Sequence, residues 1–187
     1  MLLALALTTG AWMPMQAQTF EQSVAAYERK DYRKAFAGFK KLAAQGYANA
    51  QFNLGLMYAE GRGVPKDDMM AMGWHKLAAA QGNASAQFVL GAMYADGRGV
   101  PKDDMMAMGW YVAAAEQGQA DAQFNLGLMY AEGQVVPRDY QQAYFWWLLA
   151  GTQGDKDAAK FRDLVERDFS PAQRAAAQAD ARNWKPK

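Results

Sequence analysis

The sequence predicts an all-α fold, an α/α solenoid (superhelix) in which antiparallel helix pairs stack with a 36-residue period. The stretch GRGVPKDDMMAMGW occurs twice without change, at residues 61–74 and 97–110, and again in diverged form at 133–146. Between these copies apolar residues recur at helical spacing, and glycine and proline interrupt each unit. Because one helix pair cannot bury its apolar face alone, repeated pairs must cover one another by stacking.

Four units emerge when the chain is aligned on this spacing. Three positions hold one residue type in every unit: glycine at Gly46, Gly82, Gly118 and Gly154, aspartate at Asp31, Asp67, Asp103 and Asp139, and alanine at Ala35, Ala71, Ala107 and Ala143. The predicted division is a degenerate N-terminal repeat at 18–47, repeats at 48–83, 84–119 and 120–155, and C-terminal capping helices with a tail at 156–187.

The first helix of each unit, named here the A helix, is expected at 48–60 in unit two. Ala50, Leu54 and Tyr58 share one stripe of that helix at i, i+4 and i+8. Gly55 lies inside it at a cost of about 1 kcal/mol relative to alanine, as do Gly91 and Gly127 in the next units. We therefore expect the paired helix to approach closely there, with a tryptophan ring in the space: Trp74, Trp110 or Trp146.

The second helix of each unit, the B helix, follows a loop that Gly61 and Pro65 break out of helical geometry. In unit two it starts at Asp67, whose carboxylate accepts unpaired amide hydrogens of the first turn. It runs through Trp74 and ends at Gly82, placed as a left-handed helix stop.

The pattern A-x-x-x-L-G-x-x-Y-x-x-G-x-G-V-x-x-D-x-x-x-A-x-x-W-x-x-x-A-A-x-x-G resembles the Sel-1-like repeat (SLR) family, a relative of the tetratricopeptide repeats. The match is close over residues 48–119, good to 155 and partial over 20–47. Unit four departs at Val135, which replaces a loop glycine, so a different loop path is expected. Unit one has Gly38 in the tryptophan position, which indicates an N-terminal cap.

The C-terminal segment should close the stack. An unpaired helix at 156–167 is expected to pack on unit four through Phe161, Leu164 and Val165. Ser170, Pro171 and Gln173 form a capping-box start for a last helix that ends near Trp184. Residues 183–187 are expected to be a loose tail.

The N-terminal segment differs in kind from the repeats. Leu2 to Leu7 form an apolar run, and Ala17 precedes polar Gln18. This pattern is typical of a secretory signal peptide at residues 1–17, although no basic residue precedes the apolar run. The expected location is periplasmic or secreted, with the cytoplasm as the alternative, and without stable membrane insertion after removal of the signal.

The charge and composition of the chain argue against nucleic-acid binding. Lys and Arg total 20 against 19 for Asp and Glu, a formal net charge of +1, so no broad positive field is expected. The chain has no cysteine, which excludes disulfides, thiolate nucleophiles and cysteine-containing zinc sites.

Several residues are of types found in catalytic or metal sites, but the pattern of the repeats argues against such a role for each of them. His75 shares its position with Phe39, Tyr111 and Trp147, so we expect a structural ring. The pairs Asp67–Asp68 and Asp103–Asp104 repeat identically, which favours helix capping over acid–base chemistry. We expect methionines to fill helix interfaces and not to bind Cu(I): Met69, Met70, Met72, Met105, Met106 and Met108. Arg62 and Arg98 are expected to be solvated loop charges. The sequence predicts no catalytic residue, cofactor or metal.

A binding surface is expected on the A helices. The resemblance implies that these helices line the concave side, and one flank of each changes between otherwise near-identical units. A mixture of amides, acids and small apolar groups suits a protein or an extended peptide. The predicted groove residues are Asn49, Asn53, Leu56, Glu60, Ser85, Val89, Ala92, Asp96, Asp121, Asn125, Leu128 and Glu132.

The resemblance implies a non-catalytic adaptor or scaffold for protein–protein interaction in the bacterial cell envelope. The alternative is a weak cell-wall-related enzyme or a β-lactam- or glycopeptide-binding protein, although relatives linked to those activities are rich in cysteine. The partner and the oligomeric state stay open.

Overall fold

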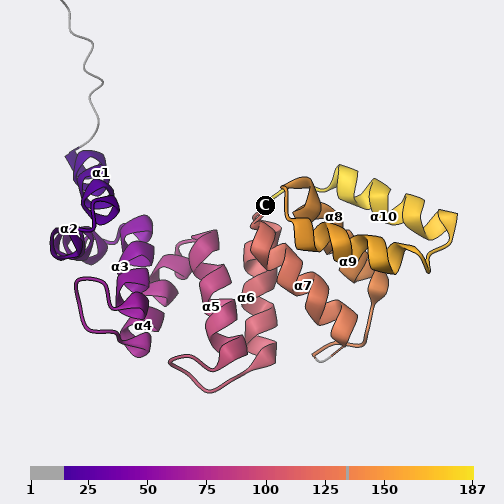
Figure 1. Cartoon of the computed structure of the whole chain (residues 1–187), viewed down its shortest axis with the longest axis horizontal. Coiled ribbons are helices and arrows are strands. Elements are labelled where there is room, and N and C mark those ends of the chain that lie inside the picture. Colours follow the sequence, from indigo (N-terminus) through magenta and orange to yellow (C-terminus); the bar gives the residue numbers. More distant parts are fainter. Residues whose placement is uncertain (1–14, 134) are drawn as a thin grey trace, which may run out of the picture.

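The computed structural model describes residues 15–133 and 135–187, with side chains from residue 19 onward. Ten helices and no strand occur in this part of the chain, so the all-α prediction is confirmed (Figure 1). The helices are α1 (Met15–Glu28), α2 (Tyr32–Ala44), α3 (Ala48–Glu60), α4 (Asp68–Ala80), α5 (Ala84–Asp96), α6 (Asp104–Glu116), α7 (Ala120–Glu132), α8 (Tyr140–Thr152), α9 (Lys156–Glu166) and α10 (Pro171–Asn183). Most of the predicted signal segment lies outside the described residues.

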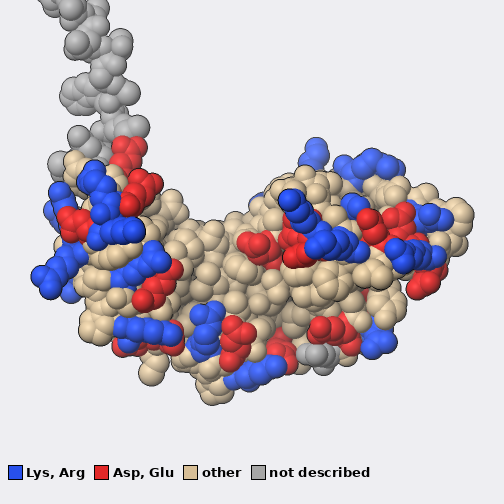
Figure 2. Space-filling view, viewed as in Figure 1, with Lys and Arg blue, Asp and Glu red and all other residues tan. Residues whose placement is uncertain are grey.

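Helices α1 to α8 form four antiparallel pairs, and each B helix also packs on the A helix of the next unit. The stack follows an arc in Figure 1, with the A-to-B loops on its lower, outer edge and the turns between units on its upper, inner edge. Figure 2 shows a hollow along that upper edge, between the α1–α2 end and the α8–α10 end. The predicted solenoid is therefore confirmed.

Aspartate starts each B helix, as predicted. The Asp67 carboxylate accepts the backbone N–H of Met70 at 2.9 Å, and Asp103 does the same for Met106. Asp31 and Asp139 cap α2 and α8 in the same way. Because these groups satisfy amide hydrogens that a helix start leaves unpaired, the repeated aspartates act in capping.

In units two and three the second glycine of the A-to-B loop has no room for a side chain, because the preceding unit packs against it. A Cβ atom on Gly99 would lie 2.6 Å from the backbone oxygen of Asp68, and Gly63 meets Tyr32 in the same way. Unit four has Val135 in this position, half-buried against the core between units three and four. Its loop still ends like the others, since Asp139 N–H donates to the Tyr130 carbonyl at 2.9 Å.

The ring beside each A-helix glycine is not the predicted tryptophan. A Cβ on Gly55 would lie 2.6 Å from Cε1 of His75, and Tyr111 and Trp147 occupy the same place beside Gly91 and Gly127. One residue further along a helix turns a side chain by about 100°. The residue after each tryptophan therefore faces its own A helix, while the tryptophan faces the preceding unit.

The tryptophans pack between units. Trp74 contacts a core cluster formed by α1, α2 and α3, Trp110 contacts one formed by α4 and α5, and Trp146 belongs to one formed by α6 and α7. Leu77 on the B helix of unit two is 50% exposed, whereas the next residue, Ala78, is buried.

A chain of glutamines joins the units, which was not predicted from the sequence. Gln87 is buried, and its amide donates to the Ala79 carbonyl at the end of the preceding B helix, at 3.3 Å. Its side-chain oxygen accepts from Gln117 at 2.7 Å. The same pair of bonds recurs in the neighbouring units at Gln51 with Gln81 and at Gln123 with Gln153. Each A helix is thereby fixed to both adjacent helix ends.

The C-terminal helices cap the stack, with two corrections. The Ser170 capping box is confirmed, and the Phe161 ring contacts Phe124 and Trp147. Leu164 does not pack on unit four, because it lies 56% exposed on the outer side of α9.

The predicted loose tail instead folds back. Trp184 packs on the core between units three and four. Lys187 N–H donates to the Glu116 carbonyl at 2.9 Å, and the Lys187 ammonium pairs with the Glu116 carboxylate at 2.7 Å. The tail therefore links α10 to the end of α6.

Across residues 15–133 and 135–187, no helix combines the length and apolar character needed to cross a bilayer.

Candidate binding surfaces

None of the twelve predicted groove residues is buried. Each of α3, α5 and α7 carries four of them, from its first turn to its last. Asn53 and Asn125 each donate to the carbonyl four residues earlier, at 2.7 and 2.8 Å. These bonds leave the side-chain oxygen of each amide available to a partner.

Several groove residues also hold the stack together. Asn49 accepts from Asn83, which caps the start of α5, at 3.0 Å, and Asp121 accepts from Gln119 at 2.9 Å. Val89 and Leu128 pack at the margins of core clusters. Ser85 and Glu132 are exposed. Some of the predicted groove residues therefore support the stack, and others are free to contact a partner.

Glu60 belongs to a polar cluster between units one and two. The Tyr27 hydroxyl donates to Glu60 at 2.8 Å, and Arg62 pairs with Glu60 at 2.9 Å. Arg62 also lies over the rings of Tyr27 and Tyr32, at 5.3 and 5.4 Å. Burial and the nearby Glu60 carboxylate raise the pKa of Tyr27.

Arg62 was predicted to be a solvated loop charge; its side chain is 41% exposed, but it also contacts unit one. Two aromatic side chains of unit one hold it because guanidinium stacks on rings. Arg98 meets that prediction better, since among the described residues its one ion pair is with nearby Asp96, at 3.2 Å, and the two side chains are 46% and 60% exposed.

His75 lies in the core. Its side chain has no solvent exposure, and it packs on Phe52 at 5.5 Å between ring centroids. Neither ring nitrogen has a hydrogen-bond partner among the described residues. Burial, with a smaller effect of Arg98, lowers the pKa of His75 to about 4. A neutral, enclosed imidazole agrees with the predicted structural role.

The methionines do not converge on one point. Met72 and Met108 are buried, whereas Met69 and Met105 are 75% and 73% exposed. Met69 and Met105 lie in the first turn of their B helices and are open to solvent, so the interface role holds for Met72 and Met108 only. No group of three or more His, Asp or Glu side chains suited to a metal ion occurs among the described residues.

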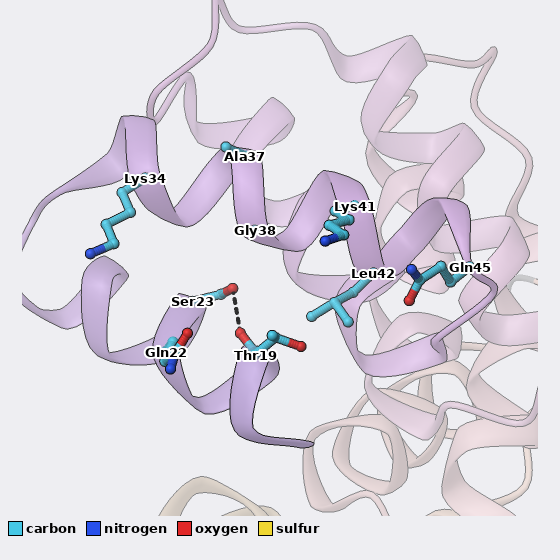
Figure 3. Close-up of a pocket in the computed structure, with 9 residues that line it drawn as sticks. All are labelled: Thr19, Gln22, Ser23, Lys34, Ala37, Gly38, Lys41, Leu42 and Gln45. Atoms are coloured by element: carbon cyan, nitrogen blue, oxygen red, sulfur yellow. Dashed lines mark hydrogen bonds between the residues drawn. The ribbon is translucent and has the colours of Figure 1, made fainter. Parts of the chain in front are cut away.

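A cavity that was not predicted from the sequence lies in unit one, between α1 and α2 (Figure 3). Its volume is about 370 Å³, within the range of small-ligand sites. The signal for it was Gly38, which by itself indicated only a cap. The lining residues are Thr19, Gln22, Ser23, Lys34, Ala37, Gly38, Lys41, Leu42 and Gln45.

The repeat geometry is matched by a known family model. The Sel1 repeat model matches residues 25–47, 48–83, 84–119 and 120–155. The chain belongs to the Sel1 repeat family. Proteins of this family are generally scaffolds that mediate protein–protein interactions and are typically non-catalytic.

Two solved Sel1 repeat structures resemble this one. The Sel1 repeat protein from Oxalobacter formigenes has a TM-score of 0.75 and 34% identity, and the match covers 78% of this chain and 60% of that chain. The second is c5321, a protective antigen present in uropathogenic Escherichia coli strains. It has a TM-score of 0.72 and 36% identity, with coverage of 76% and 32%.

A curated relative is the DAP3-binding cell death enhancer 1 of Rattus norvegicus, 51% identical over 37 residues. That match covers 20% of this chain and 7% of the relative. This chain thus spans less than two thirds of the length of each of these relatives.

Proposed function

We propose that this Sel1 repeat protein is a non-catalytic adaptor of the bacterial cell envelope, which holds a protein partner through its concave A-helix face, on the flank of α3, α5 and α7 that carries the predicted groove residues. The N-terminal pattern at residues 1–17 supports export to the periplasm or the medium. Both of the similar Sel1 repeat structures described above come from bacteria.

One observation carries the choice of surface. Between units two and three the helix cores are nearly identical, while the flank positions change from Asn53 to Val89 and from Leu56 to Ala92. All four side chains are partly open to solvent. Positions that vary while stacking is preserved are available for partner selection.

The test uses the full chain as bait in a pull-down from envelope fractions. The groove variant carries Asn53→Arg, Ala92→Arg and Asn125→Arg. The matched control carries Met69→Arg, Met105→Arg and Gln141→Arg, the same charge change on exposed B-helix positions. Circular dichroism checks that both remain helical.

The expected result is one specific prey that the groove variant loses and the control retains. Recovery of the same proteins by all three baits would reject this surface. A bait found in the cytoplasmic fraction, with residues 1–17 intact by mass spectrometry, would reject the envelope location.

A further inference from the structure

The cavity in unit one exists because two aromatic residues of the repeat are absent there. Units two to four carry a tyrosine and a tryptophan that pack on the preceding unit: Tyr58 with Trp74, Tyr94 with Trp110, and Tyr130 with Trp146. Unit one has Gln22 and Gly38 in these positions. Among the described residues, the face that other units turn toward a predecessor therefore lacks its two rings in unit one.

The floor of the cavity is formed by one apolar and one small polar side chain and is preformed. Leu42 and Ser23 are 3% and 4% exposed. The Ser23 hydroxyl donates to the Thr19 carbonyl at 2.8 Å, as Figure 3 shows. Gly38 packs directly on Ser23, so α1 and α2 are in contact beneath the cavity. An apolar side chain could occupy this space without rearrangement of the helices.

The rim of the cavity is basic. Lys34 and Lys41 lie two turns apart on α2, about 10 Å along the helix axis, and neither ammonium forms an ion pair with a described residue. Helix α2 also carries Arg33 and Lys40 and has no acidic residue. Figure 2 shows several Lys and Arg side chains at this end of the molecule, with fewer acidic side chains among them.

The charge is local. Residues 19–47 contain six basic and three acidic side chains, whereas the whole chain has a formal net charge of +1. A cap that only shields a stack from water needs neither a concave surface nor unpaired lysines beside it. Complementary charge gives specificity to a binding surface, and here it favours an anionic occupant.

We propose that the cavity between α1 and α2 binds an acidic peptide segment of a partner protein, with an aromatic side chain of the peptide in the place of the missing indole. Carboxylates beside that aromatic residue pair with Lys34 and Lys41, and Gln22 and Gln45 contact the peptide backbone. This site is separate from the flank of α3, α5 and α7, and its test does not depend on that surface.

The experiment titrates the full-length, ¹⁵N-labelled protein with the acetylated and amidated peptide GEWEG. Two control peptides replace the tryptophan by alanine or both glutamates by glutamine. The expected result is saturable binding below about 1 mM, with amide shifts concentrated at Ser23, Gly38 and Lys41. Both control peptides should bind about tenfold more weakly or worse.

Two protein variants locate the site. Lys34→Gln with Lys41→Gln should weaken GEWEG binding about tenfold, while Lys156→Gln with Lys185→Gln, an equal charge change on exposed residues, should leave it unchanged. Ser23→Ala with Gly38→Trp rebuilds the Ala59 and Trp74 arrangement of unit two and should abolish binding by filling the cavity.

Three outcomes would overturn the proposal. These are no saturable binding of GEWEG, shifts confined to other units, and equal weakening by the α2 lysine pair and the control pair. If the Ser23→Ala, Gly38→Trp protein does not fold, the lysine variants and the shift map still decide the question. In each of these three cases the open face of unit one is only a cap.

Discussion

The imidazole of His75 is enclosed between Gly55 and Phe52, and burial lowers its pKa from 6.5 to about 4. The next unit holds Tyr111 in the same place, between Gly91 and Phe88. A phenol is already uncharged at neutral pH, and burial, with a smaller effect of Asp96, raises the pKa of Tyr111 further, to about 12. This position of the repeat therefore requires an uncharged ring but accepts rings of different chemistry.

His75 should make the protein less stable in mild acid. Since the folded pKa lies below the unfolded one, the unfolded chain binds more protons between pH 6.5 and 4, and the free energy of unfolding falls as pH falls through that window. The loss at pH 4 should be about 2–3 kcal/mol. His75→Tyr should remove this component, measured by urea unfolding from pH 7 to pH 4.

Carboxylates also titrate near pH 4, so the wild-type protein minus the His75→Tyr variant is the relevant difference. Parallel loss of stability in the two proteins would show that His75 is accessible to protons in the folded state.

At the scale of helices, the distance between an A helix and its B helix depends on one glycine. A Cβ on Gly91 would lie 2.5 Å from Cδ1 of Tyr111, a distance that real side chains do not adopt. Glycine weakens an isolated helix, but here it allows a large ring to lie against the backbone. The same residue type at Gly73 faces open space, since a Cβ there would meet no atom within 4 Å.

Two glycine-to-alanine substitutions should therefore have opposite effects. Gly91→Ala should destabilise the fold by about 1–3 kcal/mol through overpacking, whereas Gly73→Ala should stabilise it by about 0.5–1 kcal/mol through helix propensity. Thermal unfolding at neutral pH measures both. Effects of the same sign would mean that helix propensity, and not the approach of Tyr111, governs the Gly91 position.

At the scale of the whole molecule, the C-terminus ties separate units together. Helix α10 packs on α8, and the tail beyond it reaches the end of α6, where Pro186 lies beside Gly118. Trp184 contributes its ring to the core between units three and four. A solenoid gains stability from contacts between neighbours, so this bridge should stabilise the C-terminal half most.

Trp184→Ala should lower the free energy of unfolding by about 2–4 kcal/mol and speed hydrogen exchange in α6, α8 and α10 more than in α3. The control is Lys185→Ala, because Lys185 is exposed and should change neither quantity. Uniform acceleration of exchange along the chain would instead indicate a single cooperative unit.

The solenoid, the helix bounds of the repeats and the capping aspartates could be predicted from the amino-acid pattern, because these follow from local geometry and a 36-residue period. The pattern did not predict which ring lies beside Gly55, how Arg62 is held, or where Trp184 and Lys187 pack. Those contacts join residues from different helices, and a spacing rule does not fix which side of a helix meets which neighbour. The cavity in unit one could not be predicted for the same reason. It depends on how α1 and α2 pack around Gly38.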